Sequence, residues 1–514
     1  MKRVLCVLMV LVMLLGISAA AESLPSSTKD TLVIAMQSDV ASLNPFYTDS
    51  ATLKRIYVQV FDQLFNYQEK SENIVCNAVE SYAFDEDYMG ISLTLRKDIV
   101  FHNGTPATSK DLQYTFEYLR NNSLGKTMDY INFDDVTIVD DYTVHVGLNY
   151  KYSALLDCLV KVSLIPKDAC EEMGDAYARA PIGSGPYKFK NWVAGDRIEL
   201  VANENYWKYQ PPIKNIIVRI ITEKAVQYIE LLTGGIDVAM DPLPADVLDA
   251  ITTKPEGIEV VNGGQVAIYF INFNYNSENE AMKNKQVRQA ISYAINHEDA
   301  AAVFGAGMTA PSYSLLPSGV FGYNAEYDKN PRYPYDPEKA KEMLAEAGYG
   351  DGLTLRVICS PMYSSIAEVV QNQLAKVGVT LDIKTYDEAT AADMQENGND
   401  YDLNFGMVNI NGDPIVSPFG THFDPDKGVM GGRNKSKNAA DPDTAKVKEL
   451  LLQLKQTFDF DERYAIMQDI MDEMMEYCWV MPVFETGVYA LKNTHLQNYM
   501  KVVNYDFFGP AYFD

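Results

Sequence analysis

The sequence predicts an α/β fold with two or more lobes, and two features of the chain carry that prediction. First, the chain has 514 residues, whereas a single hydrophobic core usually stops growing beyond about 250–300 residues. Second, an apolar run at 353–358, a helical pattern at 364–376 and another apolar run at 379–384 follow one another. A strand, a helix and a strand of these lengths form a βαβ unit with parallel strands.

The first half of the chain contains several strand patterns and one well-marked helix. The helix begins after Thr108, because Asp111 three residues on completes a signal similar to a capping box. Its apolar face consists of Leu112, Phe116 and Leu119. Apolar or alternating residues predict strands at 31–36, 93–96, 143–148, 216–221 and 267–273.

The second half of the chain has clearer signals for where its helices begin and end. Asp336 and Pro337 provide an N-cap and a first helical residue, and Gly348 ends that helix. A helix near 388–395 precedes a strand at 401–407, and ligands bind at the carboxyl ends of strands in open α/β sheets. Helices follow at 445–458 and 462–478, then a strand at 480–484. A stripe of methionines on the last helix predicts core packing: Met467, Ile470, Met471, Met474 and Met475.

The N-terminus has the layout of a secretory signal peptide, which we assign to residues 1–21. Lys2 and Arg3 precede an apolar run at 4–17, and small residues follow at 18–21. The apolar run is shorter than the ~20 residues of a membrane-spanning helix. Cys6 lies too early to be a lipid-attachment cysteine. We therefore expect a soluble exported protein without a lipid anchor, in a periplasm.

Charge and cysteine content limit the partners. The formal net charge is −27, so the surface repels phosphate backbones and nucleic acid is excluded as an expected partner. After residue 21 the chain has an odd number of cysteines, and we expect buried free thiols, with a Cys158–Cys170 disulfide as an open alternative. The cysteines are Cys76, Cys158, Cys170, Cys359 and Cys478.

Catalytic motifs do not stand out in the sequence. There is no nucleophile elbow, no P-loop and no zinc-protease motif, and the five histidines lack ligand spacing. The glycine-rich stretch 305–310 follows a helix, which is the wrong context for a dinucleotide fingerprint. The sequence therefore favours binding over catalysis, with no cofactor and no metal. A secreted hydrolase such as a peptidase, with catalytic residues dispersed along the chain, is the alternative of another class.

Blocks across almost the whole chain resemble family 5 of the extracellular solute-binding proteins, the receptors of oligopeptide, dipeptide and nickel ABC importers. The segment 95–106, LRKDIVFHNGTP, is similar to the family's LRKGVKFHDGTP. The segment 287–296, VRQAISYAIN, is similar to VRQAISYAID. Further blocks occur in family order: IGSGPY at 182–187, NENYW at 203–207, GGIDVA at 234–239 and YDPEKA at 335–340.

The resemblance implies a two-lobed periplasmic-binding-protein-like fold (type II, cluster C) that closes on a solute. It implies lobe I at 30–66, 180–273 and 482–514, an extra subdomain of lobe I at 67–179, and lobe II at 274–481. It also implies a monomer that delivers its solute to an ABC permease at the inner membrane. A chemosensory receptor is a further partner compatible with this role.

The segment 405–414, FGMVNINGDP, departs from the family pattern where peptide recognition is most direct. The family's segment resembles GWxxDxxDP, in which the tryptophan packs against the ligand and the first aspartate holds a peptide ammonium. Aligned on the final Asp-Pro, Met407 stands at the tryptophan position and Ile410 at the aspartate position. Asp413 offers a carboxylate, although the resemblance favours loop support as its role.

Two hypotheses for the ligand remain open. In the first, a peptide binds and its amine is held elsewhere, with Asp49 as a candidate. In the second, the solute is less cationic, such as a sugar, a modified amino acid, a blocked peptide or a metal chelate, because Asn amides suit neutral polar ligands. The candidate ligand-binding residues are Thr48, Asp49, Ser50, Met407, Val408, Asn409, Ile410, Asn411 and Asp413.

Overall fold

The computed structural model describes residues 24–48, 50–68, 70–275, 277–305, 307–397, 400–410, 412–419, 424, 442–502 and 505–514. The predicted signal peptide therefore lies outside the described residues. No helix among the described ranges is long and apolar enough to cross a membrane.

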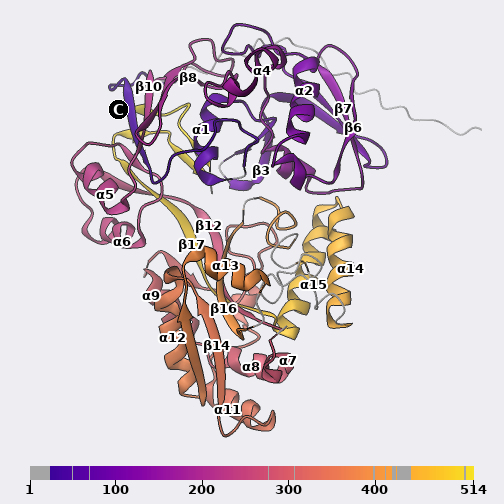
Figure 1. The fold of residues 1–514 in the computed structure, drawn as a ribbon, viewed down its shortest axis with the longest axis vertical. Helices are drawn as coiled ribbons and strands as arrows, with labels where there is room; N and C mark the ends of the chain where they lie inside the picture. Colours follow the sequence, from indigo (N-terminus) through magenta and orange to yellow (C-terminus); the bar gives the residue numbers. More distant parts are fainter. Residues whose placement is uncertain are drawn as a thin grey trace, which may run out of the picture.

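One large sheet runs through both halves of the molecule (Figure 1). Its main path follows the order β15-β14-β16-β12-β17-β11-β1-β10-β9-β8, and β13 pairs with β17 off this path. The strands of the upper half in Figure 1 are β1 (Thr31–Met36), β8 (Tyr187–Val193), β9 (Arg197–Ala202), β10 (Asn215–Ile220) and β11 (Val238–Ala239). Those of the lower half are β13 (Thr309–Pro311), β14 (Leu353–Cys359), β15 (Val379–Thr385) and β16 (Leu403–Asn409).

Two long strands join the two halves. β12 (Ile258–Phe273) and β17 (Val480–Asn493) run antiparallel along most of their lengths. Near its end β17 pairs with β11 of the upper half, whereas the last seven residues of β12 pair with β16 of the lower half. The fold class is thus confirmed as two-lobed and α/β. The residue bounds of the lobes and of the extra subdomain remain a proposal.

A separate four-stranded antiparallel sheet lies beside the upper half, in the order β4-β5-β7-β6. Its helix α2 (Ser109–Arg120) begins at the predicted Thr108, whose backbone N–H and hydroxyl both donate to the Asp111 carboxylate. The strands are β4 (Val79–Phe84), β5 (Gly90–Leu95), β6 (Ile131–Ile138) and β7 (Thr143–Leu148). The neighbouring elements are β2 (Phe65–Gln68), β3 (Lys70–Cys76), α3 (Leu155–Leu159) and α4 (Lys167–Met173).

Helices cover the large sheet on both halves (Figure 1). The upper half has α1 (Ala51–Val60), α5 (Lys224–Leu232) and α6 (Pro244–Thr253), and the C-terminal segment adds β18 (Leu496–Gln497), β19 (Met500–Val502), β20 (Tyr505–Phe507) and β21 (Tyr512–Phe513). The lower half has α7 (Glu280–Lys283), α8 (Lys285–Tyr293), α9 (His297–Gly305), α10 (Glu326–Lys329), α11 (Pro337–Glu346), α12 (Ser364–Ala375), α13 (Glu388–Asn397), α14 (Pro442–Gln456) and α15 (Phe460–Tyr477).

Most predicted elements are confirmed, but four strands run beyond their predicted bounds. β17 ends at Asn493 rather than 484, and β5 begins at Gly90 rather than 93. The pair β14 and β15 is parallel with α12 between them, and the Asp336 carboxylate caps α11 as predicted. β16 ends at Asn409 rather than 407, because Val408 and Asn409 still find partners on β12. β12 begins at Ile258, before the predicted 267, because its ladder with β17 continues past Gly263 and Gly264 through register shifts.

The five cysteines named above are free thiols, so the open Cys158–Cys170 alternative is wrong. Four of them are buried as predicted, whereas Cys76 is exposed, which corrects the prediction for that residue. The methionine stripe of α15 is buried and belongs to the hydrophobic core, as predicted.

Replacing Met474 by alanine should lower the free energy of unfolding by about 2–5 kcal/mol, because the side chain is fully buried and its loss leaves a cavity. Leu452 on α14 is 56% exposed, so Leu452→Ala is the matched control. This substitution should change the free energy of unfolding by less than about 0.5 kcal/mol. Urea unfolding of both variants measures the difference. Equal effects would contradict the core assignment of the stripe.

Candidate functional site

The strand pair β12–β16 separates two cavities, one on each of its faces. In an antiparallel pair, side chains alternate between the faces, and directly opposed residues point the same way. Phe270 opposes Gly406 and Asn272 opposes Asn404, so these four share one face. Tyr269 opposes Met407 and Ala267 opposes Asn409, so these four share the other. The first set lines one cavity and the second set lines the other, while Met407 of the second set also reaches the cavity of the first set.

The first cavity, of about 200 Å³, lies where the upper half meets the joining strands. The joining strand β12 contributes Tyr269. The lower half contributes Phe304 and Met407, with Asn409 as a polar neighbour. The upper half contributes Lys224, Asp241, Pro242, Pro244 and Val247. We name it the interlobe cavity.

The carboxylate of the interlobe cavity is already paired. The Asp241 oxygens accept two hydrogen bonds from the Arg55 guanidinium, at 2.5 and 2.6 Å. Burial works against ionisation of Asp241, but the charge of Arg55 outweighs it and lowers the Asp241 pKa to about 2. Arg55 also contacts Asp506, which accepts from the buried Lys501. Asp241 is therefore an ionised part of a charge network rather than a free acid or base.

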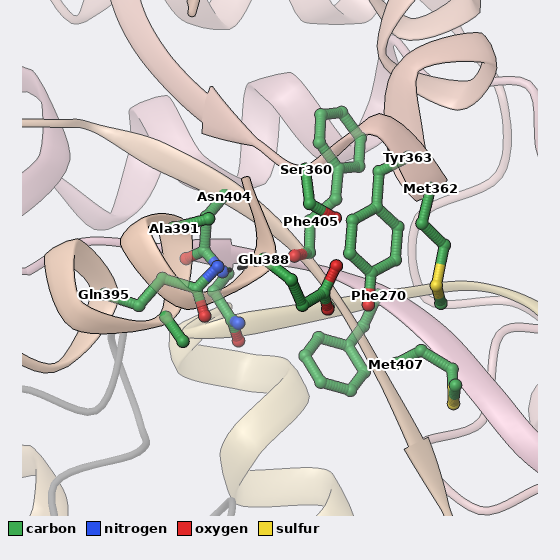
Figure 2. A pocket seen from close by; sticks show the side chains of 13 residues that line it. Phe270, Ser360, Met362, Tyr363, Glu388, Ala391, Gln395, Asn404, Phe405 and Met407 are labelled. Atoms are coloured by element: carbon green, nitrogen blue, oxygen red, sulfur yellow. Dashed lines mark hydrogen bonds between the residues drawn. The ribbon is translucent and has the colours of Figure 1, made fainter. Parts of the chain in front are cut away.

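The second cavity, of about 320 Å³, lies inside the lower half, and we name it the amide cavity (Figure 2). β14 pairs with β16 only as far as Asn404, after which the chain turns away into the segment of Ser360 and Tyr363. The edge of β16 beyond that point is flanked by α13, which contributes Glu388, Ala391, Ala392 and Gln395. The remaining lining residues are Phe270, Asn272, Ser360, Met362, Tyr363, Asn404, Phe405, Gly406 and Met407.

Three buried oxygens on residues that line the amide cavity lack a hydrogen-bond partner among the described residues: Asn272 Oδ1, Asn404 Oδ1 and Ser360 Oγ. Their residues are 5, 1 and 3% exposed, respectively. Leaving a buried polar group unpaired costs about 1–3 kcal/mol. Buried polar atoms of this kind usually find their partner in an ordered water, an ion or a ligand.

Glycine at position 406 makes room for this lining. A Cβ atom there would lie 2.4 Å from the Phe270 ring, which packs across the glycine on the opposite strand. The ring in turn forms one wall of the amide cavity.

The loop after β16 is held by charge. Asp413 forms an ion pair with the buried Arg463 of α15. The other Asp413 oxygen accepts the Ile415 N–H at 3.0 Å, and the Asp413 N–H donates to Asp157 Oδ1 at 3.0 Å. Asp157 belongs to α3, so this hydrogen bond joins the lower half to the region of the small sheet. The contacts of Asp413 are those of a loop-supporting residue.

The other predicted site residues are distributed between several environments. Met407 lines both cavities and Asn409 lines the interlobe cavity. Val408 is buried, and Ile410 is fully buried with its N–H donating to the Val266 carbonyl. Ser50 caps α1 by accepting the Leu53 N–H, and Thr48 is half-buried, with neither lining the two cavities. Asp49 and Asn411 lie outside the described residues.

Sequence reasoning missed the amide cavity. Asn272 and Asn404 each interrupt an apolar strand pattern, and such buried amides are a usable signal, but only the register brings them opposite each other. Arg463 also had a signal, because it lies on the same face of α15 as Met467 and Ile470. Among the described residues, no group of three or more His, Cys, Asp or Glu side chains could hold a metal ion.

Comparison with known proteins places the chain in a family. Residues 73–428 match the model of the bacterial extracellular solute-binding proteins, family 5. The chain therefore belongs to this family of receptors.

Proteins similar in sequence to this chain are named for different ligands. The chain is 27% identical over 388 residues to a glutathione-binding protein of Salmonella typhimurium, covering 74% of each chain. It is 26% identical over 437 residues to heme-binding protein A of Haemophilus influenzae, covering 78% of this chain and 79% of that one. The same identity and length relate it to a dipeptide-binding protein of Escherichia coli, covering 78 and 80%.

Solved structures share the fold. The substrate-binding protein CtaP of Listeria monocytogenes superposes with a TM-score of 0.82 at 21% identity, covering 94% of this chain and 99% of that one. HbpA2 of Haemophilus parasuis gives a TM-score of 0.81 at 22% identity, covering 94 and 100%.

The Asp157–Asp413 contact predicts a pH-dependent stability. Burial, then the Asp413 carboxylate, raise the pKa of Asp157 well above its usual range, and Arg463 and Lys161 oppose this only in part. The unfolded chain has an aspartate pKa of about 4. Since the folded state holds this proton more tightly, stability falls as pH rises from about 4 through the raised pKa. Asp157→Asn keeps the Oδ1 acceptor without the charge, so it should raise the melting temperature at pH 8 and less so at pH 5.

Thermal unfolding at the two pH values measures this effect. Asp168→Asn on α4 is the control, because Asp168 is exposed and the substitution removes the same charge. The account is contradicted if both variants shift the melting temperature alike at pH 8.

Proposed function

We propose that this chain is an exported receptor that captures a peptide or peptide-like solute between its two lobes and delivers it to an ABC permease at the inner membrane. It acts as a monomer in the periplasm, after removal of residues 1–21. It is a binding protein and not an enzyme. The observation that carries the proposal is a family-5 fold with two cavities on opposite faces of β12–β16.

The mode of peptide binding differs from that implied by the family segment. Ile410 is fully buried and provides no carboxylate, and Asp413 is engaged by Arg463. A buried ammonium needs a paired charge, because an unpaired one costs several kcal/mol. A solute with a free amine is therefore held by a group outside this loop.

A non-peptide solute on the same fold is the second candidate. The amides of Asn272, Asn404 and Asn409 on the cavity walls favour it, because each amide offers both donors and an acceptor to neutral polar groups. A sugar, a modified amino acid or a metal chelate would fit such a lining. Delivery to a chemosensory receptor is compatible with either solute.

Native mass spectrometry of the freshly purified mature protein, followed by denaturation, tests the proposal. The expected result is the release of a set of peptide masses, one bound per protein molecule. A single non-peptide mass would contradict the peptide assignment and favour the second candidate. A parallel incubation with isotope-labelled short peptides should return them intact, whereas cleavage products that grow with time would show a peptidase instead of a receptor.

A further inference from the structure

We infer that the amide cavity holds a cationic N–H donor group of the solute, an ammonium or a guanidinium, with Glu388 as its counter-charge. The inference rests on the proposed function, because it concerns how the receptor recognises its solute. It is carried by the juxtaposition of one unpaired carboxylate with three unpartnered buried oxygens in one cavity.

Of the carboxylates near β16 that the two cavities and the adjoining loop offer, one is a candidate counter-charge for a cationic solute group. Among the described residues, two carboxylates line the two cavities: Asp241 in the interlobe cavity and Glu388 in the amide cavity. Asp241 is paired with Arg55 through two hydrogen bonds, and Asp413 on the adjoining loop is paired with Arg463. Glu388 is exposed at the mouth of the amide cavity, and its carboxylate has no ion pair or hydrogen bond to any residue that the structure describes.

The acceptors around Glu388 are suited to N–H donors. Asn404 Nδ2 donates to the Phe405 carbonyl at 3.3 Å, which leaves Oδ1 as the free end of that amide. Asn272 opposes Asn404 across the strand pair, and Ser360 follows the end of β14. An ammonium has three donors and a guanidinium five, and neither has an acceptor. Such a group would satisfy the orphan oxygens as well as the charge.

The rest of the lining agrees with a cation. The described residues that line the amide cavity include no Lys, Arg or His, so none of them competes for Glu388 with a positive charge. Phe270, Phe405 and Tyr363 provide aromatic walls, and aromatic rings attract cations. The volume of about 320 Å³ is at the lower end of the range for small-molecule sites, which suits one end of a solute.

The test uses a defined mixture of peptides as the probe. A tryptic digest of serum albumin supplies peptides with free amines that end in Lys or Arg, and acetic anhydride blocks the amines of a second aliquot. Each aliquot is incubated with protein from which any co-purified solute has been removed, and retained peptides are identified by mass spectrometry. Four proteins are compared: the unmodified protein, Glu388→Gln, Asn404→Leu and the control Asp393→Asn, which removes a charge from α13 outside the cavity lining.

The inference predicts that the unmodified protein and Asp393→Asn retain peptides, and that Glu388→Gln retains about tenfold to hundredfold less. Acetylation should cause a similar loss if an ammonium enters the cavity. If Arg-ending peptides remain bound after acetylation and depend on Glu388, the group is a guanidinium. Equal retention by Glu388→Gln and the unmodified protein overturns the inference but leaves the receptor function intact. Failure of the unmodified protein to retain any peptide overturns the proposed peptide receptor, and the inference with it.

Asn404→Leu separates a binding role from a structural one. The substitution removes an orphan oxygen, so the ligand-free protein should melt at the same temperature as the unmodified protein or higher, while peptide retention falls at least tenfold. A lower melting temperature with retention unchanged would assign the amide to the fold and contradict the inference.

Discussion

The pairing of β12 with β17 is the constraint on which the rest of the structure depends. Both strands continue from the sheet of one half into the sheet of the other, so the two halves share one hydrogen-bonded ladder. The register of this ladder fixes β16, and β16 fixes which side chains face each cavity. A receptor that closes by hinge motion needs such strands, because a few residues where the halves join can absorb the change in backbone angles.

Charge pairing then decides what each cavity can bind. Ionised groups that are removed from water are stable only with a partner, and the structure provides arginines for Asp241 and Asp413. These pairs support the fold and leave the aspartates unavailable for a solute. The amide cavity has the opposite character, since its oxygens lack partners among the described residues. These oxygens are therefore available to a solute that donates N–H groups.

Local signals in the sequence were enough to predict much of the second half. The Asp336-Pro337 cap, the βαβ unit of β14, α12 and β15, and the methionine stripe of α15 each depend on residues close in sequence. The bounds of β12 and β16 were not predictable in the same way. Gly263 and Gly264 are typical of a turn, and Asn409 of a strand end, yet partners on the neighbouring strands extend both ladders.

The site was less predictable than the fold, because it is built from distant contacts. Met407 and Asn409 were predicted and do line a cavity, but the pairing of Asp413 with Arg463 joins residues 50 positions apart. The opposition of Asn272 and Asn404 depends on strand register, and Glu388 belongs to a helix whose sequence gave no functional signal. Arg288 on α8 illustrates the same limit, because it donates to the carbonyls of Met282, Tyr477 and Cys478, and the last two lie 189 and 190 positions away in the sequence.

A crystal structure of the protein with its co-purified solute tests the central claim most directly. The account predicts a solute nitrogen within hydrogen-bond distance of the Glu388 carboxylate and of at least one of Asn272 Oδ1, Asn404 Oδ1 and Ser360 Oγ. A solute bound elsewhere, with only water in the amide cavity, would contradict it.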